Sequence, residues 1–294
     1  MNPIFTGCAT ALVTPFTETG VNYDALGKLI DFQIENHVDA LVICGSTGEP
    51  ATMTDDEHVN VMKYAIEHIA GRVPVIAGTA SNDTAYAVKI SKEACSFGAD
   101  ALLIAAPYYN KPTQKGLYMH YAAIAEAVDI PIILYNIPGR TGCNLLPKTV
   151  QKLAEFDNIV GIKEASGDLS HVAKIAHLMQ GKDFAIYSGN DDQVLPVLSL
   201  GGKGVISVLS NICPQDTHDM VHAYLNGDTK RATELQLNML DLINALFVET
   251  NPIPVKTALN ILGFNTGNLR LPLCEMEEAN LQILKNAMKD YGLI

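Results

Sequence analysis

Tryptophan is absent from the 294-residue chain, and its six cysteines are scattered without a Cys-x-x-Cys pair. This spacing gives no support for a zinc ribbon or a dithiol redox site, because both need closely spaced thiols. We therefore expect each cysteine to be an isolated, buried thiol, which suits a reducing compartment. The cysteines stand at positions 8, 44, 95, 143, 213 and 274.

The chain also lacks a long apolar run, although 48% of its residues are hydrophobic. No stretch reaches the roughly 18 apolar residues that a transmembrane helix needs. The first residues, Met1-Asn-Pro-Ile-Phe-Thr6, have no basic segment followed by an apolar one, so no signal peptide is visible. These features predict a soluble cytoplasmic protein that does not enter a membrane.

Positive charge is scarce, with 20 lysines and arginines against 32 acidic residues and a net charge of −12. Nucleic acids and anionic membranes attract basic surfaces, so neither is expected as the main partner. The length permits one large domain or two ordinary ones.

Short apolar runs alternate with amphipathic stretches as far as residue 208. Each unit takes about 20–35 residues, a normal size for a strand, a helix and the connection to the next parallel strand. The strands lack polar alternation, which fits a sheet covered on both faces. The pattern predicts a closed (β/α)8 TIM barrel. The expected strands are residues 8–13, 40–44, 73–77, 101–105, 131–135, 159–163, 185–187 and 204–208.

Helical spacing fills the segments between these strands, with Thr54 as an expected N-cap and Gly98 as an expected helix end. An open doubly wound sheet is the alternative, but no Gly-x-Gly-x-x-Gly follows the first strand. After Pro214 the pattern stays helical. We expect a barrel of residues 1–225 and a C-terminal helical extension of residues 226–294. The predicted helices are residues 23–36, 55–69, 83–97, 114–128, 147–155, 169–179, 193–200, 217–225, 230–247, 255–262 and 275–289.

Lys163 ends the apolar strand 159–163 and precedes the turn Ser166-Gly-Asp168. Burial disfavours the charged ammonium, so a desolvated lysine has a lowered pKa and can attack a carbonyl to form a Schiff base. The alternative is a strand-end lysine whose amine reaches water. In a TIM barrel, catalytic groups come from the C-terminal ends of the strands, which is where Lys163 stands.

Other polar and aromatic residues follow the strands at the same end. Tyr135 could carry a proton or be a core tyrosine. Arg140 could clamp a substrate carboxylate or be a solvated loop residue. The run Gly45-Ser-Thr-Gly48 could bind a carboxylate through its N–H groups and hydroxyls, or simply form a capped turn. It lacks the Gly-Lys-Ser/Thr of a P-loop, so nucleotide binding is not expected.

Two further segments leave alternatives open. Tyr108 and Tyr109 could form an aromatic contact across a subunit interface or pack within their loop. The run Asn190-Asp-Asp192 is a weak metal motif that a helix N-cap explains as well. Since no histidine cluster stands at the strand ends, we expect no metal and disfavour a class II aldolase.

Six motifs, in order and in register with the strands, make the whole chain resemble the dihydrodipicolinate synthase family, part of the class I aldolase superfamily that includes N-acetylneuraminate lyase. The resemblance implies condensation of pyruvate with aspartate-4-semialdehyde, the first committed step of the diaminopimelate route to lysine. It also implies no cofactor and a homotetramer built as a dimer of dimers. The motifs are Thr14-Pro-Phe16, Gly45-Ser-Thr-Gly-Glu49, Pro107-Tyr-Tyr-Asn110, Tyr135-Asn-Ile-Pro-Gly-Arg-Thr-Gly142, Gly161-Ile-Lys-Glu-Ala-Ser166 and Gly204-Val-Ile-Ser-Val208.

The resemblance also implies catalytic roles. Lys163 would form the iminium with pyruvate, and Tyr135 would shuttle protons to and from it. Ser46 would link Tyr135 to Tyr109, which reaches in from the neighbouring subunit. Many members have threonine where Ser46 stands; serine keeps the hydroxyl but frees the rotamer, and we expect the relay to survive.

For substrate binding, the resemblance implies that Thr47 holds the pyruvate carboxylate. Arg140 would steady the carboxylate of the semialdehyde and order Tyr109. Gly189 and Ile206 would add main-chain contacts around the bound keto acid.

Family members that lysine inhibits bind it at the tight dimer interface, where they carry serine, histidine and glutamate at the positions of Pro50, Asp55 and Tyr86. The loss of that glutamate removes a partner for the ammonium of the ligand, although Asp55 could partly substitute. We therefore predict weak or absent lysine feedback. The other matching positions are Ala51, His58, Asn82 and Tyr108.

Two rival functions follow from the same residues. Another pyruvate-linked class I aldolase, such as N-acetylneuraminate lyase or a keto-deoxy sugar acid aldolase, would share Lys163 and Tyr135. Arg140, within Gly-Arg-Thr-Gly, suits a short carboxylated aldehyde better than a polyol. The other rival is a barrel that only binds a ligand or partner, which would form no reducible imine with pyruvate.

Overall fold

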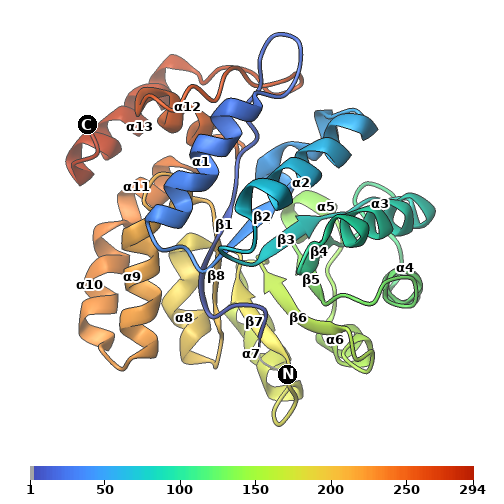
Figure 1. The fold of residues 1–294 in the computed structure, drawn as a ribbon. Helices are drawn as coiled ribbons and strands as arrows, with labels where there is room; N and C mark the ends of the chain where they lie inside the picture. Colours follow the sequence, from blue (N-terminus) through green and yellow to red (C-terminus); the bar gives the residue numbers. More distant parts are fainter. Residues whose placement is uncertain (1–2) are drawn as a thin grey trace.

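Parallel strands close into one barrel in chain order in the computed structural model, which describes residues 3–294 (Figure 1). The predicted TIM barrel is therefore confirmed, and each predicted strand is present with its ends shifted by at most two residues. The strands are β1 (Gly7–Ala11), β2 (Ala40–Ile43), β3 (Val75–Gly78), β4 (Ala101–Ala105), β5 (Ile132–Asn136), β6 (Ile159–Glu164), β7 (Ala185–Ser188) and β8 (Gly204–Ser207).

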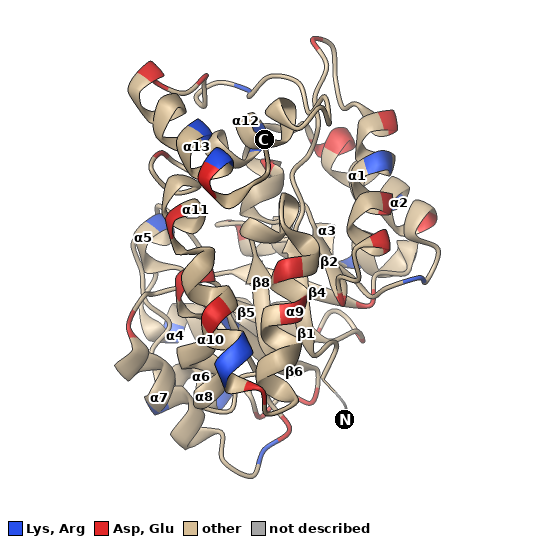
Figure 2. Ribbon diagram, turned by 90° about the vertical axis from the view of Figure 1, so that its left-hand side faces the viewer, with Lys and Arg blue, Asp and Glu red and all other residues tan. Residues whose placement is uncertain are grey.

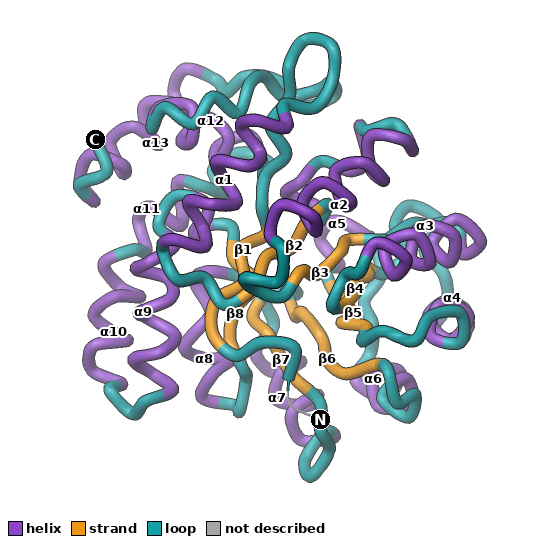
Figure 3. Tube along the Cα trace, in the orientation of Figure 1, coloured by secondary structure: helices purple, strands orange, loops and turns teal. Residues whose placement is uncertain are grey.

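Helices form a ring around the strands, as Figure 3 shows in purple around orange. The predicted cap of the second helix is confirmed: the Thr54 side chain accepts from the backbone N–H of Glu57, whose carboxylate accepts from the N–H of Thr54. Gly98 ends the third helix with φ +94°. The helices of the ring are α1 (Tyr23–Glu35), α2 (Asp55–Ile69), α3 (Thr84–Phe97), α4 (Gln114–Ala125), α6 (Pro147–Leu153), α7 (Leu169–Leu178), α8 (Val194–Ser199) and α9 (Pro214–Leu225).

The core has two layers because each strand is buried on both faces. Alternate residues such as Ala9 and Ala11 point into the barrel, while Cys8 packs against the helices. Phe5 stacks on Tyr187 with ring centroids 4.3 Å apart, and the Tyr187 hydroxyl donates to the Phe5 carbonyl. Phe5 and Tyr187 thus pack together within the cluster of side chains inside the barrel.

The C-terminal segment differs from prediction at one helix. The expected helix over 230–247 is wrong, because α10 (Thr229–Asn238) and α11 (Leu240–Ala245) are separated at the buried Met239. The two pieces pack on different partners, α10 on α9 and α11 on α13, so one straight helix could not make both contacts. Figure 2 shows α9 and α10 side by side. The chain ends with α12 (Ile253–Ile261) and α13 (Glu278–Tyr291).

The predicted boundary after residue 225 falls in the turn between α9 and α10, and the division into barrel and extension stays a prediction. A short helix, α5 (Pro138–Thr141), lies in a segment for which no helix was predicted. Its proline occupies the first helical turn, where the missing N–H costs no hydrogen bond.

All six cysteines are free thiols, as expected, but not all are buried. Cys95 and Cys143 are half-buried and Cys274 is exposed, so the expectation of burial is wrong for these three. Cys274 lies in the irregular segment before α13, outside any packed element. Among the described residues, no helix has both the length and the apolar character required to cross a membrane.

Candidate active site

Lys163 lies near the end of β6 with its side chain buried at 5% exposure. It pairs in register with Tyr135 on β5, and its Nζ lies 4.4 Å from the centroid of the tyrosine ring. Burial lowers the pKa of Lys163 to about 8, with Asp191 opposing the shift and Arg140 adding to it. Roughly a tenth of this amine is therefore unprotonated at pH 7, far more than for an ordinary lysine, and is able to act as a nucleophile.

Tyr135 lies beside Lys163 and is itself buried. Burial raises the pKa of Tyr135 to about 12, although Arg140 and a hydrogen bond with Ser46 favour the phenolate. Its hydroxyl therefore remains protonated near neutral pH. Ser46 comes from the 3-10 turn that follows β2, so strands β2, β5 and β6 bring Ser46, Tyr135 and Lys163 together.

Thr47 and Arg140 are joined through Asn251, a residue that the sequence did not single out. The side-chain amide of Asn251 donates to Thr47 Oγ1 at 2.9 Å, and Arg140 Nη2 donates to the Asn251 carbonyl at 2.7 Å. Asn251 lies just before α12. No periodic pattern marks it, because it stands in an irregular link more than 100 residues away from both partners. The C-terminal segment thus supplies a residue to the barrel site.

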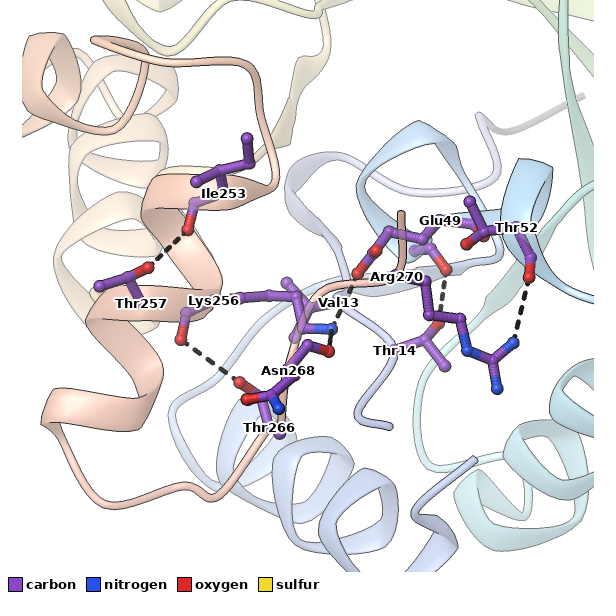
Figure 4. Close-up of polar contacts among 12 residues, drawn as sticks. Val13, Thr14, Glu49, Thr52, Ile253, Lys256, Thr257, Thr266, Asn268 and Arg270 are labelled. Atoms are coloured by element: carbon purple, nitrogen blue, oxygen red, sulfur yellow. Dashed lines mark hydrogen bonds and ion pairs between the residues drawn. The ribbon is translucent and has the colours of Figure 1, made fainter. Parts of the chain in front are cut away.

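A buried ion pair ties the Gly45–Glu49 turn to α12. Lys256 Nζ donates to Glu49 Oε1 at 2.8 Å, and each side chain is only 1% exposed. Figure 4 shows these residues with Thr14, whose hydroxyl donates to the Gly48 carbonyl. Lys256 Nζ also lies 4.5 Å from the centroid of the Phe16 ring. Since Ser46 and Thr47 belong to this turn, the ion pair helps to fix their positions.

Gly189 follows β7 and allows close approach to the lysine. A Cβ at this position would lie 2.6 Å from the Ala165 Cβ and 3.0 Å from the Lys163 Cε, so a larger residue would displace them. Ile206 lies on β8 and is fully buried among the side chains inside the barrel.

Asp191 does not act as the N-cap that was offered as one explanation of Asn190-Asp-Asp192. Its Oδ2 accepts from the backbone N–H groups of Val208 and Leu209, both at 3.0 Å, while α8 begins without a side-chain cap. Asp191 is buried because it joins the loop after β7 to the loop after β8. It also acts on the pKa of Lys163, which neither the N-cap nor the metal interpretation anticipated.

Tyr109 stands apart from the other predicted site residues in this single chain. Its side chain is 87% exposed, and its backbone has φ +72°, a left-handed conformation that is uncommon for a tyrosine. The loop after β4 thus exposes the Tyr109 ring to solvent in an unfavourable backbone conformation. Ser46 and Tyr135, in contrast, line a pocket at the C-terminal end of the strands.

That pocket has a volume of about 550 Å³ and opens at the C-terminal end of the strands. Ser46, Tyr135, Arg140 and Asn251 line one part of it. Lys163 does not line the pocket itself. It packs against Tyr135, which does line the pocket.

Residues 4–291 match the family described as Dihydrodipicolinate synthetase family. The chain belongs to this family. It is 57% identical to the 4-hydroxy-tetrahydrodipicolinate synthase of Thermoanaerobacter sp. strain X514, over 99% of this chain and 98% of that protein.

Solved structures of family members superpose closely on the fold. A structure described as the first monomeric dihydrodipicolinate synthase variant is 42% identical, with a TM-score of 0.97 and coverage of 99% of this chain and 98% of the other. The enzyme of Cyanidioschyzon merolae with lysine bound is 43% identical, with a TM-score of 0.95 and coverage of 99% of each chain.

Most of the positions that were compared with the lysine-sensitive pattern line the same pocket as Tyr135, whereas Asn82 does not. Asp55 is not free there, because Tyr86 donates to its Oδ1 at 2.9 Å and Lys89 Nζ lies 3.7 Å from its Oδ2. The pocket also includes Pro50, Ala51, His58 and Tyr108.

Proposed function

We infer that this chain catalyses the reaction of its curated relatives and is a lyase that makes 4-hydroxy-tetrahydrodipicolinate from pyruvate and L-aspartate-4-semialdehyde. The observation that carries this conclusion is the buried Lys163 amine, which lies against Tyr135 with its pKa near 8 in a chain of this family. The reaction is the first committed step of the diaminopimelate route to lysine.

In the proposed first half-reaction, the free amine of Lys163 attacks the keto carbon of pyruvate and the carbinolamine loses water. The Tyr135 hydroxyl gives and takes the protons that these steps require. Thr47 holds the pyruvate carboxylate, and main-chain groups of Gly189 and Ile206 contact the bound keto acid. Loss of a methyl proton from the iminium then gives an enamine.

In the second half-reaction, the enamine carbon attacks the aldehyde carbon, whose oxygen becomes the 4-hydroxyl group after protonation. The amine of the former semialdehyde then attacks the iminium carbon, which closes the ring and releases Lys163. Arg140 holds the semialdehyde carboxylate. Since the iminium of Lys163 serves as the electron sink, we propose that the enzyme needs no other cofactor. We therefore expect a chelator to leave turnover unchanged in a steady-state assay.

The rate of imine formation with pyruvate is expected to rise with pH and to level off above about pH 8, because only the unprotonated Lys163 attacks. Arg140 helps to lower this pKa, so Arg140→Met should move the midpoint to higher pH. Borohydride trapping at timed intervals across pH 6–10 measures both profiles. If the midpoint of the pH profile were the same in Arg140→Met as in the wild type, Arg140 would not lower the pKa of Lys163.

We propose that the active form is a homotetramer, a dimer of dimers, in which Tyr109 reaches the site of a neighbouring subunit. The exposed ring of Tyr109 and its left-handed backbone conformation support this assignment. Tyr109→Phe is expected to lower kcat by about 10²-fold, since it removes a proton-relay hydroxyl and leaves the ring in place. Tyr118→Phe on α4 is the matched control. Normal turnover in Tyr109→Phe would remove Tyr109 from the relay, and sedimentation tests the tetramer separately.

We predict that lysine inhibits this enzyme weakly or not at all. Tyr86 stands where lysine-sensitive members have glutamate, and it engages the nearby Asp55. The wild type should need well over millimolar lysine for half-inhibition, whereas Tyr86→Glu should become more sensitive because it restores an acidic partner for the ligand ammonium. Half-inhibition of the wild type at sub-millimolar lysine would refute the prediction.

We also propose a cytoplasmic location, with no nucleic acid or membrane as partner. The six free thiols support a reducing compartment. The net charge of −12 argues against anionic partners.

A further inference from the structure

Three potential metal ligands meet at the N-terminal end of the barrel, away from Lys163. Asp39 immediately precedes β2, and His218 and His222 lie on α9. His222 Nε2 lies 3.0 Å from Asp39 Oδ1 and 3.1 Å from Oδ2, and His218 Nδ1 lies 3.2 Å from Oδ2. Among residues 3–294, this is the one group of three such side chains whose ligand atoms all lie within 4.8 Å of one another.

The local structure holds these side chains in place. His218 and His222 are four residues apart, so they share a face of α9, and their ring centroids are 4.0 Å apart. The backbone N–H of Cys8 donates to Asp39 Oδ2 at 2.7 Å and orients the carboxylate. Gly7 leaves room for the group, because a Cβ there would collide with the Asp39 carboxylate and lie 2.6 Å from His222 Nε2.

We propose that Asp39, His218 and His222 form a binding site for a divalent transition-metal ion, with Zn²⁺ as the best match. Two imidazoles favour zinc over magnesium or calcium, which prefer oxygen ligands. A histidine pair at i and i+4 on a helix is a known zinc-binding arrangement, and three protein ligands leave the fourth tetrahedral position to water.

The distances require little adjustment for such an ion. Bonds of 2.0–2.2 Å at tetrahedral angles place ligand atoms about 3.4 Å apart, and the separations of 3.0–3.2 Å need to widen by only a few tenths of an ångström. Each histidine would bind through the nitrogen that now faces Asp39 and carry its proton on the other ring nitrogen. The side chains are 20–34% exposed, which leaves a path for the ion.

The position of the site indicates a structural role. The ion would connect α9, which follows the last strand, to the start of β2 and, through Asp39, to β1. It would thus cross-link segments that are about 180 residues apart in the sequence, at the place where the barrel closes. Residues at this end of a TIM barrel serve stability rather than catalysis. The bound ion is therefore expected to raise thermal stability without changing turnover, whatever the substrate of the enzyme.

The test uses the full-length, untagged protein after treatment with a chelator and dialysis. Added Co²⁺ should give the visible absorption of a tetrahedral site, and Zn²⁺ should displace it with one ion bound per chain. Zn²⁺ at about 100 times its Kd should raise Tm by about 5–10 °C. His218→Gln and His222→Gln should abolish both the spectrum and the Tm rise.

His37→Asn is the matched control. Its ring lies 6.2 Å from that of His218, outside the ligand set, and asparagine tolerates the left-handed backbone of residue 37. This variant should bind Co²⁺ like the wild type, and circular dichroism should show that all variants are folded. The proposal is overturned if the wild type shows no Co²⁺ spectrum at metal excess, or if folded His222→Gln keeps an unchanged spectrum.

Discussion

Lys163→Ala is expected to lower kcat by on the order of 10⁴-fold or more, because it removes the amine that bonds to pyruvate. Among the described residues, no other group at the strand ends combines burial with a pKa of about 8 and contact with Tyr135. The variant should also form no borohydride-stable adduct with pyruvate. Steady-state turnover and trapping measure the two effects independently.

A suitable control is Lys203→Ala, which removes an exposed lysine just before β8. It should keep wild-type turnover and the adduct on Lys163. Circular dichroism separates loss of chemistry from loss of fold. Normal turnover in folded Lys163→Ala would show that the proposed Schiff-base mechanism is wrong.

Lys256→Met is expected to destabilise the fold by about 3–5 kcal/mol, because it leaves the Glu49 carboxylate buried without its cation. Burial of Lys256 lowers its pKa and Glu49 opposes that shift, so the charged pair depends on both members. Guanidinium unfolding should report the change. Turnover should fall as well, since Glu49 ends the turn that carries Ser46 and Thr47.

The double variant Lys256→Met, Glu49→Leu tests the physical reason for this loss. It removes the unpaired charge and should recover much of the stability, because apolar replacement of a buried ion pair is often nearly neutral. Lys289→Met, an exposed lysine on α13, is the control and should unfold like the wild type. If Lys256→Met were as stable as the wild type, the Lys256–Glu49 ion pair would contribute nothing to fixing the Gly45–Glu49 turn.

The barrel could be predicted because its signal is local and repeated. Each strand is a short apolar run, and each helix has its own period and end signals such as Thr54 and Gly98. The break at Met239 could not be predicted in this way, since it depends on what α10 and α11 pack against. Likewise, α5 is a single turn, too short for a periodic pattern.

The same distinction between local patterns and long-range contacts applies to the candidate site. Lys163, Tyr135 and Ser46 stand at strand ends, and the topology of a parallel barrel brings such ends together, as the structure shows. Asn251 and Lys256 reach the site from more than 200 residues beyond Thr47 and Glu49, and no local pattern encodes those contacts. The role of Tyr109 depends on a second chain and stays a prediction.

The proposed metal ligands are hard to recognise in the sequence for a different reason. His218 and His222 are visible as a pair at i and i+4, but their partner Asp39 lies about 180 residues earlier. Catalytic metal ligands are expected at the C-terminal ends of the strands, whereas this group lies at the opposite end of the barrel.

The most direct test of the proposed chemistry is a mass spectrum of the protein after incubation with pyruvate and borohydride, with the modified peptide mapped. We predict a single reduced pyruvyl adduct on Lys163. An unmodified protein, or an adduct on a different lysine, would contradict the account.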